Sequence, residues 1–98
     1  MGEAIDKGLS LELPDYRSNL YYERSVAKAN MKQYEEALAD IEQALKLQPS
    51  SMKCLYFKSR IEVYLGNTSA ARHGAREVLK NIPDHTGALR ILEEIGNQ

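Results

Sequence analysis

The stretch YEEALADIEQALKLQP, residues 34–49, decides the fold of this chain. Its apolar residues recur at steps of three and four, from Tyr34 through Ile41 to Leu45, which places them on one stripe of an α-helix. Pro49 ends the stretch, because proline has no backbone N–H with which to continue a helix. A second stretch ends in the same way at Pro83, 34 residues later. The spacing predicts a repeated helical unit that ends at each proline.

The sequence, shifted by 34 residues against itself, aligns residues of the same kind. The identical pairs include Tyr22 with Tyr56, Ser25 with Ser59, Ala37 with Ala71, Leu45 with Leu79, Lys46 with Lys80 and Pro49 with Pro83. Small residues at four of these positions suit two helices that cross closely. Residues 31–33 and 66–67 are too short for more than a tight turn, so each unit is predicted to be an antiparallel helix pair.

Residues at the predicted ends of these helices have suitable backbone chemistry. Gly66 can adopt the positive φ that ends a helix. Ser50 and Ser51 follow the first proline and Asp84 follows the second. All three are good N-caps for the next helix.

Together these residues resemble the tetratricopeptide repeat, a 34-residue helix–turn–helix unit that stacks into a superhelix. The matching residues are Tyr21, Ser25, Tyr34, Ala37, Ile41, Ala44 and Pro49 in one unit, and Leu55, Ser59, Gly66, Ala71, Ala75 and Pro83 in the next. The resemblance implies an all-α, right-handed superhelical array of antiparallel helix pairs. We expect a single domain over 1–98, with repeats at 18–51 and 52–85 and a capping helix at 86–98. Residues 1–17 are expected to be the tail of a preceding repeat, within a longer array.

Four charged residues stand where this family usually has apolar ones. They are Arg24 and Lys28 in the first unit, and Lys58 and Glu62 in the second. Long polar side chains at such positions can keep their apolar stems on the protein and their charge in water. We expect all four to extend outward.

Composition and motifs argue against catalysis, metal binding and nucleic acid. The net charge is −1, so a basic surface for nucleic acid or membrane is not expected. His73 and His85 have no acidic or cysteine partner at metal-ligand spacing, and we expect no metal and no cofactor. Adjacent acids such as Glu35 and Glu36 diverge around a helix and do not share a reacting centre. A lone Cys54 cannot form an internal disulfide, which favours an intracellular, cytoplasmic setting.

The resemblance also implies a binding surface, because the first helix of each pair lines a concave groove in this family. Steps of three and four place each expected set on one helical face. The expected groove residues are Asn19, Tyr22, Glu23, Val26 and Asn30 in the first unit, Lys53, Tyr56, Phe57, Arg60 and Tyr64 in the second, and Arg90 after them, with Glu94 as an extension. Aromatic side chains beside cations are typical of protein anchor sites. Some of these rings, Tyr22 and Tyr56 above all, could instead pack between helices.

The leading functional hypothesis is a protein–protein interaction module that binds a peptide or helix of a partner, as an adaptor or scaffold. One subclass of the family binds the acidic C-terminal tails of chaperones, and such a co-chaperone role is the alternative. Lys53 matches a lysine of that subclass, whereas Glu23 replaces an asparagine and Phe57 an arginine. A third possibility is a spacer or self-association module, with Tyr16, Leu9 and Leu11 at the contact.

Overall fold

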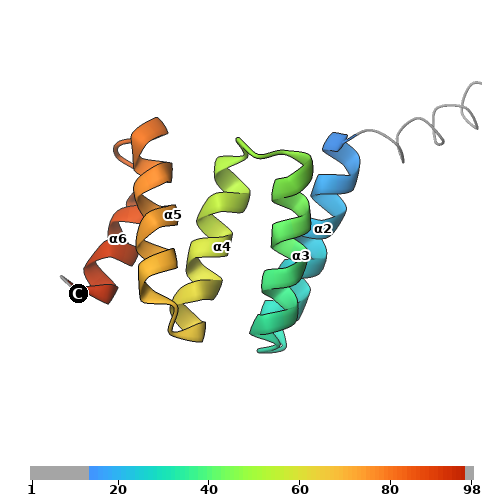
Figure 1. Ribbon diagram of the computed structural model, residues 1–98, viewed down its shortest axis with the longest axis horizontal. Helices are drawn as coiled ribbons and strands as arrows, with labels where there is room; N and C mark the ends of the chain where they lie inside the picture. The colour runs from blue at the N-terminus through green and yellow to red at the C-terminus, as the bar shows by residue number, and fades with distance from the viewer. Residues whose placement is uncertain (1–13, 97–98) are drawn as a thin grey trace, which may run out of the picture.

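The computed structural model describes residues 14–96, which form five helices in a row (Figure 1). The helices are α2 (Pro14–Asn30), α3 (Tyr34–Leu47), α4 (Met52–Leu65), α5 (Thr68–Asn81) and α6 (Thr86–Ile95). Each helix packs against the next along the chain, and α4 also contacts α6. The molecule measures 56 × 29 × 18 Å, with a radius of gyration of 15.0 Å, against about 13 Å for a compact domain of 100 residues. The predicted all-α helical-repeat fold is therefore confirmed, and residues 14–96 contain no strand.

The core consists of two similar clusters. The buried residues of one come from α3 and α4, and those of the other from α5 and α6. Ala37, Ile41 and Ala44 of α3 meet Cys54 and Ile61 of α4 in the first cluster. The second consists of Ala71, Ala75, Val78, Ala88, Ile91 and Ile95, from α5 and α6. Each second helix is thus covered on both sides by first helices. Alanines at the crossings let the helices approach closely.

The turns within the two helix pairs have the same backbone geometry but different residues. Gly66 has a φ of 82°, and the N–H of Asn67 donates to the carbonyl of Glu62 at 2.8 Å. At the equivalent turn Lys32 has a φ of 63°, and the N–H of Gln33 donates to the carbonyl of Lys28 at 2.9 Å. A lysine therefore occupies the left-handed conformation that glycine adopts in the second pair. That conformation strains a residue with a Cβ atom.

The helix N-caps agree with the prediction at α4 and differ from it at α6. The hydroxyl of Ser51 accepts a hydrogen bond from the N–H of Cys54 at 3.3 Å. At α6 the cap is His85, whose Nδ1 accepts from the N–H of Ala88 at 3.0 Å. Asp84 lies one residue too early, in the turn that follows Pro83.

The N-terminal boundary also differs from the prediction. Residues 14–17 are the first turn of α2 and not the tail of a preceding helix. Proline is well tolerated in the first turn of a helix, because the N–H that it lacks has no partner within the helix there. Residues 1–13 lie outside the described part of the chain.

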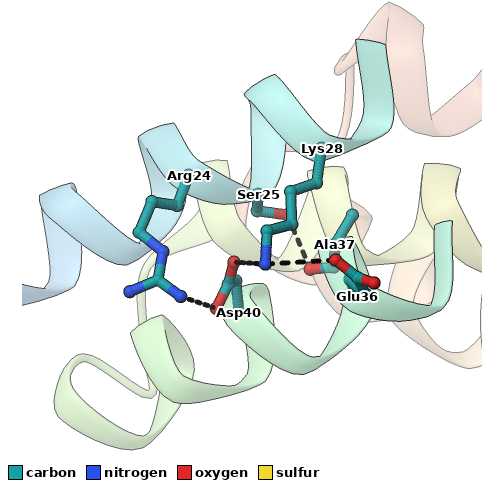
Figure 2. A network of polar contacts seen from close by, with 6 residues as sticks. All are labelled: Arg24, Ser25, Lys28, Glu36, Ala37 and Asp40. Carbon is teal, nitrogen blue, oxygen red and sulfur yellow. Dashed lines mark hydrogen bonds and ion pairs between the residues drawn. The ribbon is translucent and has the colours of Figure 1, made fainter. Parts of the chain in front are cut away.

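A polar network joins the two helices of the first pair (Figure 2). Arg24 and Lys28 of α2 reach across to Asp40 of α3, at 3.4 and 3.7 Å, and Lys28 also pairs with Glu36 at 3.3 Å. Asp40 is buried, with 6% of its surface exposed. The sequence predicts that Arg24 and Lys28 extend outward into water. In the structure both side chains instead pair with Asp40. They compensate a carboxylate that folding removes from solvent.

The second helix pair also has a buried carboxylate with a cation beside it, but both residues belong to the same helix, α4. Gly74 replaces the aspartate at the position equivalent to Asp40. Lys58 then pairs with Glu62, one turn further along α4, at 2.6 Å. The expectation that Glu62 extends outward is wrong, because the residue is only 4% exposed. Its charge is compensated by Lys58 and not by water.

Candidate functional site

The first helices of the array, α2 and α4, present equivalent residues to one another across a shared face. Lys53 of α4 donates from Nζ to Asn19 Oδ1 of α2 at 3.2 Å, between positions separated by 34 residues. The same Nζ lies 4.3 Å from the centre of the Tyr22 ring, within the range of a cation–π contact. Lys53 therefore contacts two other expected groove residues, Asn19 and Tyr22.

Two of the predicted groove aromatics pack edge to face on each other. The rings of Tyr22 and Phe57 have centroids 5.6 Å apart at 65°. Both residues are half-buried and lie against the first core cluster. Burial raises the pKa of the Tyr22 phenol above its ordinary value of 10.0, Cys54 and Glu23 act in the same direction, and Arg60 opposes them. These rings therefore support the helix packing as well as the exposed face.

Tyr56 is held in place by the start of α6. Its ring lies 4.7 Å from the ring of His85, centroid to centroid. A Cβ atom added to Gly87 would come within 2.5 Å of the Tyr56 ring. Glycine at this position thus makes room for the tyrosine. The guanidinium of Arg60 lies 5.8 Å from the centre of the same ring.

Two clefts lie along this face. The α2–α4 cleft, of about 250 Å³, is lined by Ala29, Asn30, Lys32, Tyr34, Phe57, Arg60, Ile61 and Tyr64. The α4–α6 cleft, of about 430 Å³, is lined by Tyr56, Arg60, Val63, Tyr64, Gly87, Arg90, Ile91 and Glu94. Arg60 and Tyr64 line both, so the two clefts are neighbours on this face. We call the two clefts together the groove.

The groove contains one aromatic side chain that sequence reasoning did not place there. Tyr34, the first residue of α3, stacks on Tyr64 with ring centroids 4.7 Å apart and planes only 4° from parallel. Tyr64 is nevertheless 60% exposed. The periodicity of residues 34–49 assigns Tyr34 to the core stripe and gives no sign of this contact. Conversely, five of the expected groove residues line neither cleft: Asn19, Tyr22, Glu23, Val26 and Lys53.

The charges of the groove are unpaired. Among residues 14–96, no ion pair involves Arg60, Arg90 or Glu94. The same residues include no group of three or more histidine, cysteine or acidic side chains placed to hold a metal ion. No helix among them is long and apolar enough to span a bilayer.

A separate apolar patch lies on α2, away from the groove. Tyr16 is 40% and Leu20 45% exposed, and Leu20 lines a shallow depression with Arg17, Tyr21 and Arg24. The equivalent of Leu20 in the next unit is Cys54, which α3 buries. The other residues expected at a self-association contact, Leu9 and Leu11, lie outside the described residues.

Residues 18–51 match the family model described as tetratricopeptide repeat. The chain is 29% identical over 96 residues to the Hsp70/Hsp90 co-chaperone CNS1 of Saccharomyces cerevisiae, covering 95% of this chain and 25% of that protein. It is 31% identical over 90 residues to the TPR repeat-containing protein PA4667 of Pseudomonas aeruginosa, covering 92% and 15%. It is also 31% identical over 87 residues to the human mitochondrial import receptor subunit TOM70, covering 80% and 14%. The chain thus spans a quarter or less of each of these relatives.

Proposed function

This chain belongs to the tetratricopeptide repeat family, and we propose that it binds a peptide or helix of a partner protein in the groove, as an adaptor or scaffold. The observation that carries this proposal is the pair of neighbouring clefts that share Arg60 and Tyr64. Two neighbouring clefts can hold more than one side chain of a partner. An isolated depression would hold only one.

The chemistry of the groove suits binding. Tyr56 and Tyr64 offer rigid contact area at a low cost in side-chain entropy, because a tyrosine has few rotatable bonds. Arg60 and Arg90 add charge and hydrogen-bond donors that no acidic side chain among the described residues occupies. Aromatic and arginine residues are the types most often found at the energetic centre of protein interfaces.

Affinity capture with a paired variant tests this proposal. Arg60→Glu with Tyr64→Ala changes two exposed groove residues and should leave the helices intact. Arg76→Glu with His73→Ala makes comparable changes at exposed positions of α5 and serves as the matched control. Circular dichroism should show equal helicity for all three proteins.

The wild type and the α5 control should capture the same proteins from a cell extract, and the groove variant should lose them. Equal capture by all three proteins would refute the groove as the binding surface. Capture by none of them would count against a binding role and favour the hypothesis of a spacer or self-association module. Sedimentation over a range of concentrations then tests self-association through the patch around Leu20.

Binding of acidic chaperone tails is a second candidate, which the similarity to a protein named as an Hsp70/Hsp90 co-chaperone supports. Lys53 is available near the groove, although it already contacts Asn19 and Tyr22. Glu23 is exposed on α2 and would repel a terminal carboxylate placed beside it. An acidic peptide with a free C-terminal carboxylate should bind more tightly than its amidated form if this candidate holds. Equal binding of the two peptides would exclude it.

We also propose a cytoplasmic setting. Cys54 is a buried free thiol in the first core cluster. The fold therefore uses its one cysteine as a small apolar residue and gains nothing from an oxidising environment. Imaging of the tagged protein in cells tests this placement.

A further inference from the structure

The two clefts of the groove share one chemical character, because aromatic rings line both of them. The rings are those of Tyr34, Phe57 and Tyr64 in the α2–α4 cleft, and of Tyr56 and Tyr64 in the α4–α6 cleft. The whole chain has only six tyrosines, one phenylalanine and no tryptophan. The groove therefore contains more than half of the aromatic side chains of the chain.

Neighbouring residues hold these rings in place. Tyr64 is 60% exposed, yet one face of its ring stacks on Tyr34. Tyr56 lies against the ring of His85 and occupies the space that Gly87 leaves. Rings that are already ordered lose little side-chain freedom when a partner packs on them.

The polar side chains of the groove are mostly hydrogen-bond donors. Lys32, Arg60 and Arg90 line it and form no ion pair among residues 14–96. Lysine and arginine side chains can donate hydrogen bonds but cannot accept them. The one carboxylate in either cleft is Glu94, and Asn30 adds one amide. The groove therefore has more donors than acceptors, and its excess charge is positive.

An excess of donors favours a partner whose backbone supplies acceptors. Each residue of an ordinary extended segment has one C=O and one N–H, whereas proline has only the C=O. A helix is different again, because its carbonyls bond to its own N–H groups. A proline-rich segment would therefore leave the fewest N–H groups without a partner in this groove, and each such group that is buried costs free energy.

We propose that the groove binds a proline-rich segment of a partner protein in the polyproline II conformation, with acidic and not basic residues among the prolines. This inference rests on the binding role proposed above and specifies the partner. The proline rings would pack on Tyr56 and Tyr64, while Arg60 and Arg90 would donate to the carbonyls between them. Aromatic-lined grooves bind such segments at a low entropy cost, because polyproline II is largely formed before binding. The positive charge of the groove disfavours basic residues in the segment.

The likeness of the two clefts also suits this ligand. Polyproline II repeats every three residues, so it presents the same rings and carbonyls again along its length. Two neighbouring clefts with the same aromatic and cationic lining can then contact the same kind of group twice.

The test is a random library of peptides about 12 residues long, roughly four turns of polyproline II, displayed between fixed flanking sequences so that no peptide has a free terminus. The library is selected against the whole chain and against Tyr64→Ala. The matched control is Tyr16→Ala, which removes the same side chain at another exposed position, on α2 and outside both clefts. Arg60→Gln is a second groove variant, in case Tyr64→Ala perturbs folding, and Arg76→Gln at an exposed position of α5 is its control.

The wild type and both controls should enrich peptides with repeated prolines, and with Asp or Glu in preference to Lys or Arg. An enriched peptide is then synthesised in two forms of equal charge, one with its prolines and one with alanine in their place. The alanine form should bind the wild type at least roughly tenfold more weakly, and the groove variants should bind the proline form more weakly by a similar factor.

Three results would overturn the inference and leave the binding role intact. They are enrichment of acidic peptides without prolines, enrichment of peptides with apolar residues at helical steps of three and four, and equal binding of the proline and alanine forms. Undiminished binding of the proline form by both groove variants would overturn the groove as the binding surface and this inference with it. Failure of the wild type to enrich any peptide would overturn the binding role itself.

Discussion

Ser25 and Ser59 occupy the same position in the two repeats, and we predict that replacing each with alanine changes stability in opposite directions. Both side chains are fully buried. Ser25 Oγ donates to the carbonyl of Ala37 at 2.7 Å (Figure 2). Ser59 Oγ has no hydrogen-bond partner, although it is as deeply buried. The identical residues therefore have different energetic roles.

The expected magnitudes follow from these contacts. Ser25→Ala loses an internal hydrogen bond, and a typical loss of this kind costs about 1 kcal/mol. Ser59→Ala removes a hydroxyl that was desolvated without compensation, a penalty of about 1–3 kcal/mol in proteins. Alanine also has a higher helix propensity than serine. We therefore expect Ser59→Ala to raise the free energy of unfolding by about 1 kcal/mol, and Ser25→Ala to lower it by about the same amount.

Urea denaturation followed by circular dichroism measures both effects as shifts of the midpoint at constant slope. For a domain of this size, about 1 kcal/mol corresponds to roughly 4–8 °C in Tm. Gly74 provides an internal check, because a Cβ atom added there would overlap Ser59 Oγ. Gly74→Ala should destabilise the wild type and be tolerated in the Ser59→Ala background. The reasoning is refuted if Ser59→Ala destabilises the protein as much as Ser25→Ala does.

Two further predictions concern the turns and the fall of the free energy of unfolding at alkaline pH. Lys32→Gly should raise the free energy of unfolding by about 1 kcal/mol, because it removes the strain of a left-handed lysine, and Gly66→Ala should lower it by a similar amount. Thermal melts of the two variants give the direction of each change in stability. A change in the same direction for both variants would contradict the geometry of the turns. Burial raises the pKa of Tyr22 in the folded state, so the unfolded chain ionises first above about pH 10 and stability falls as pH rises towards the folded pKa. Tyr22→Phe should therefore lose less stability between about pH 9 and 11 than the wild type, and an unchanged pH dependence would show that Tyr22 makes no such contribution.

The helix pairs and the small residues at their crossings could be predicted from the sequence because they depend on local periodicity. The 34-residue shift places Ala37 and Ala71 at equivalent crossings, and both are fully buried. The same shift brings Asn19 and Lys53 to neighbouring places, where they form a hydrogen bond. In a repeated sequence, the equivalent positions of two units support the same structural prediction. Each of these pairs is therefore supported by both units.

The features that the sequence did not predict depend on single side chains and their neighbours. Glu62 is buried, and its charge is compensated by Lys58 one turn away on the same helix, whereas the family pattern at this position only suggests an apolar residue. His85 caps α6 through Nδ1, a role that residue preferences assign to Asp84. The stacking of Tyr34 on Tyr64 requires the start of α3 to approach α4. Periodicity describes one helix at a time and cannot show such an approach.

The groove divides into residues that support the fold and residues that can vary freely. Tyr56 and Phe57 are half-buried and pack on the core clusters, so changes there alter stability as well as binding. Arg60 and Arg90 are exposed on the same surface, and surface substitutions usually change stability by no more than about 0.5 kcal/mol. Partner preference can therefore change through these cations while the half-buried rings hold the helices in register. This separation is the physical reason that one helical-repeat scaffold can present different binding chemistries.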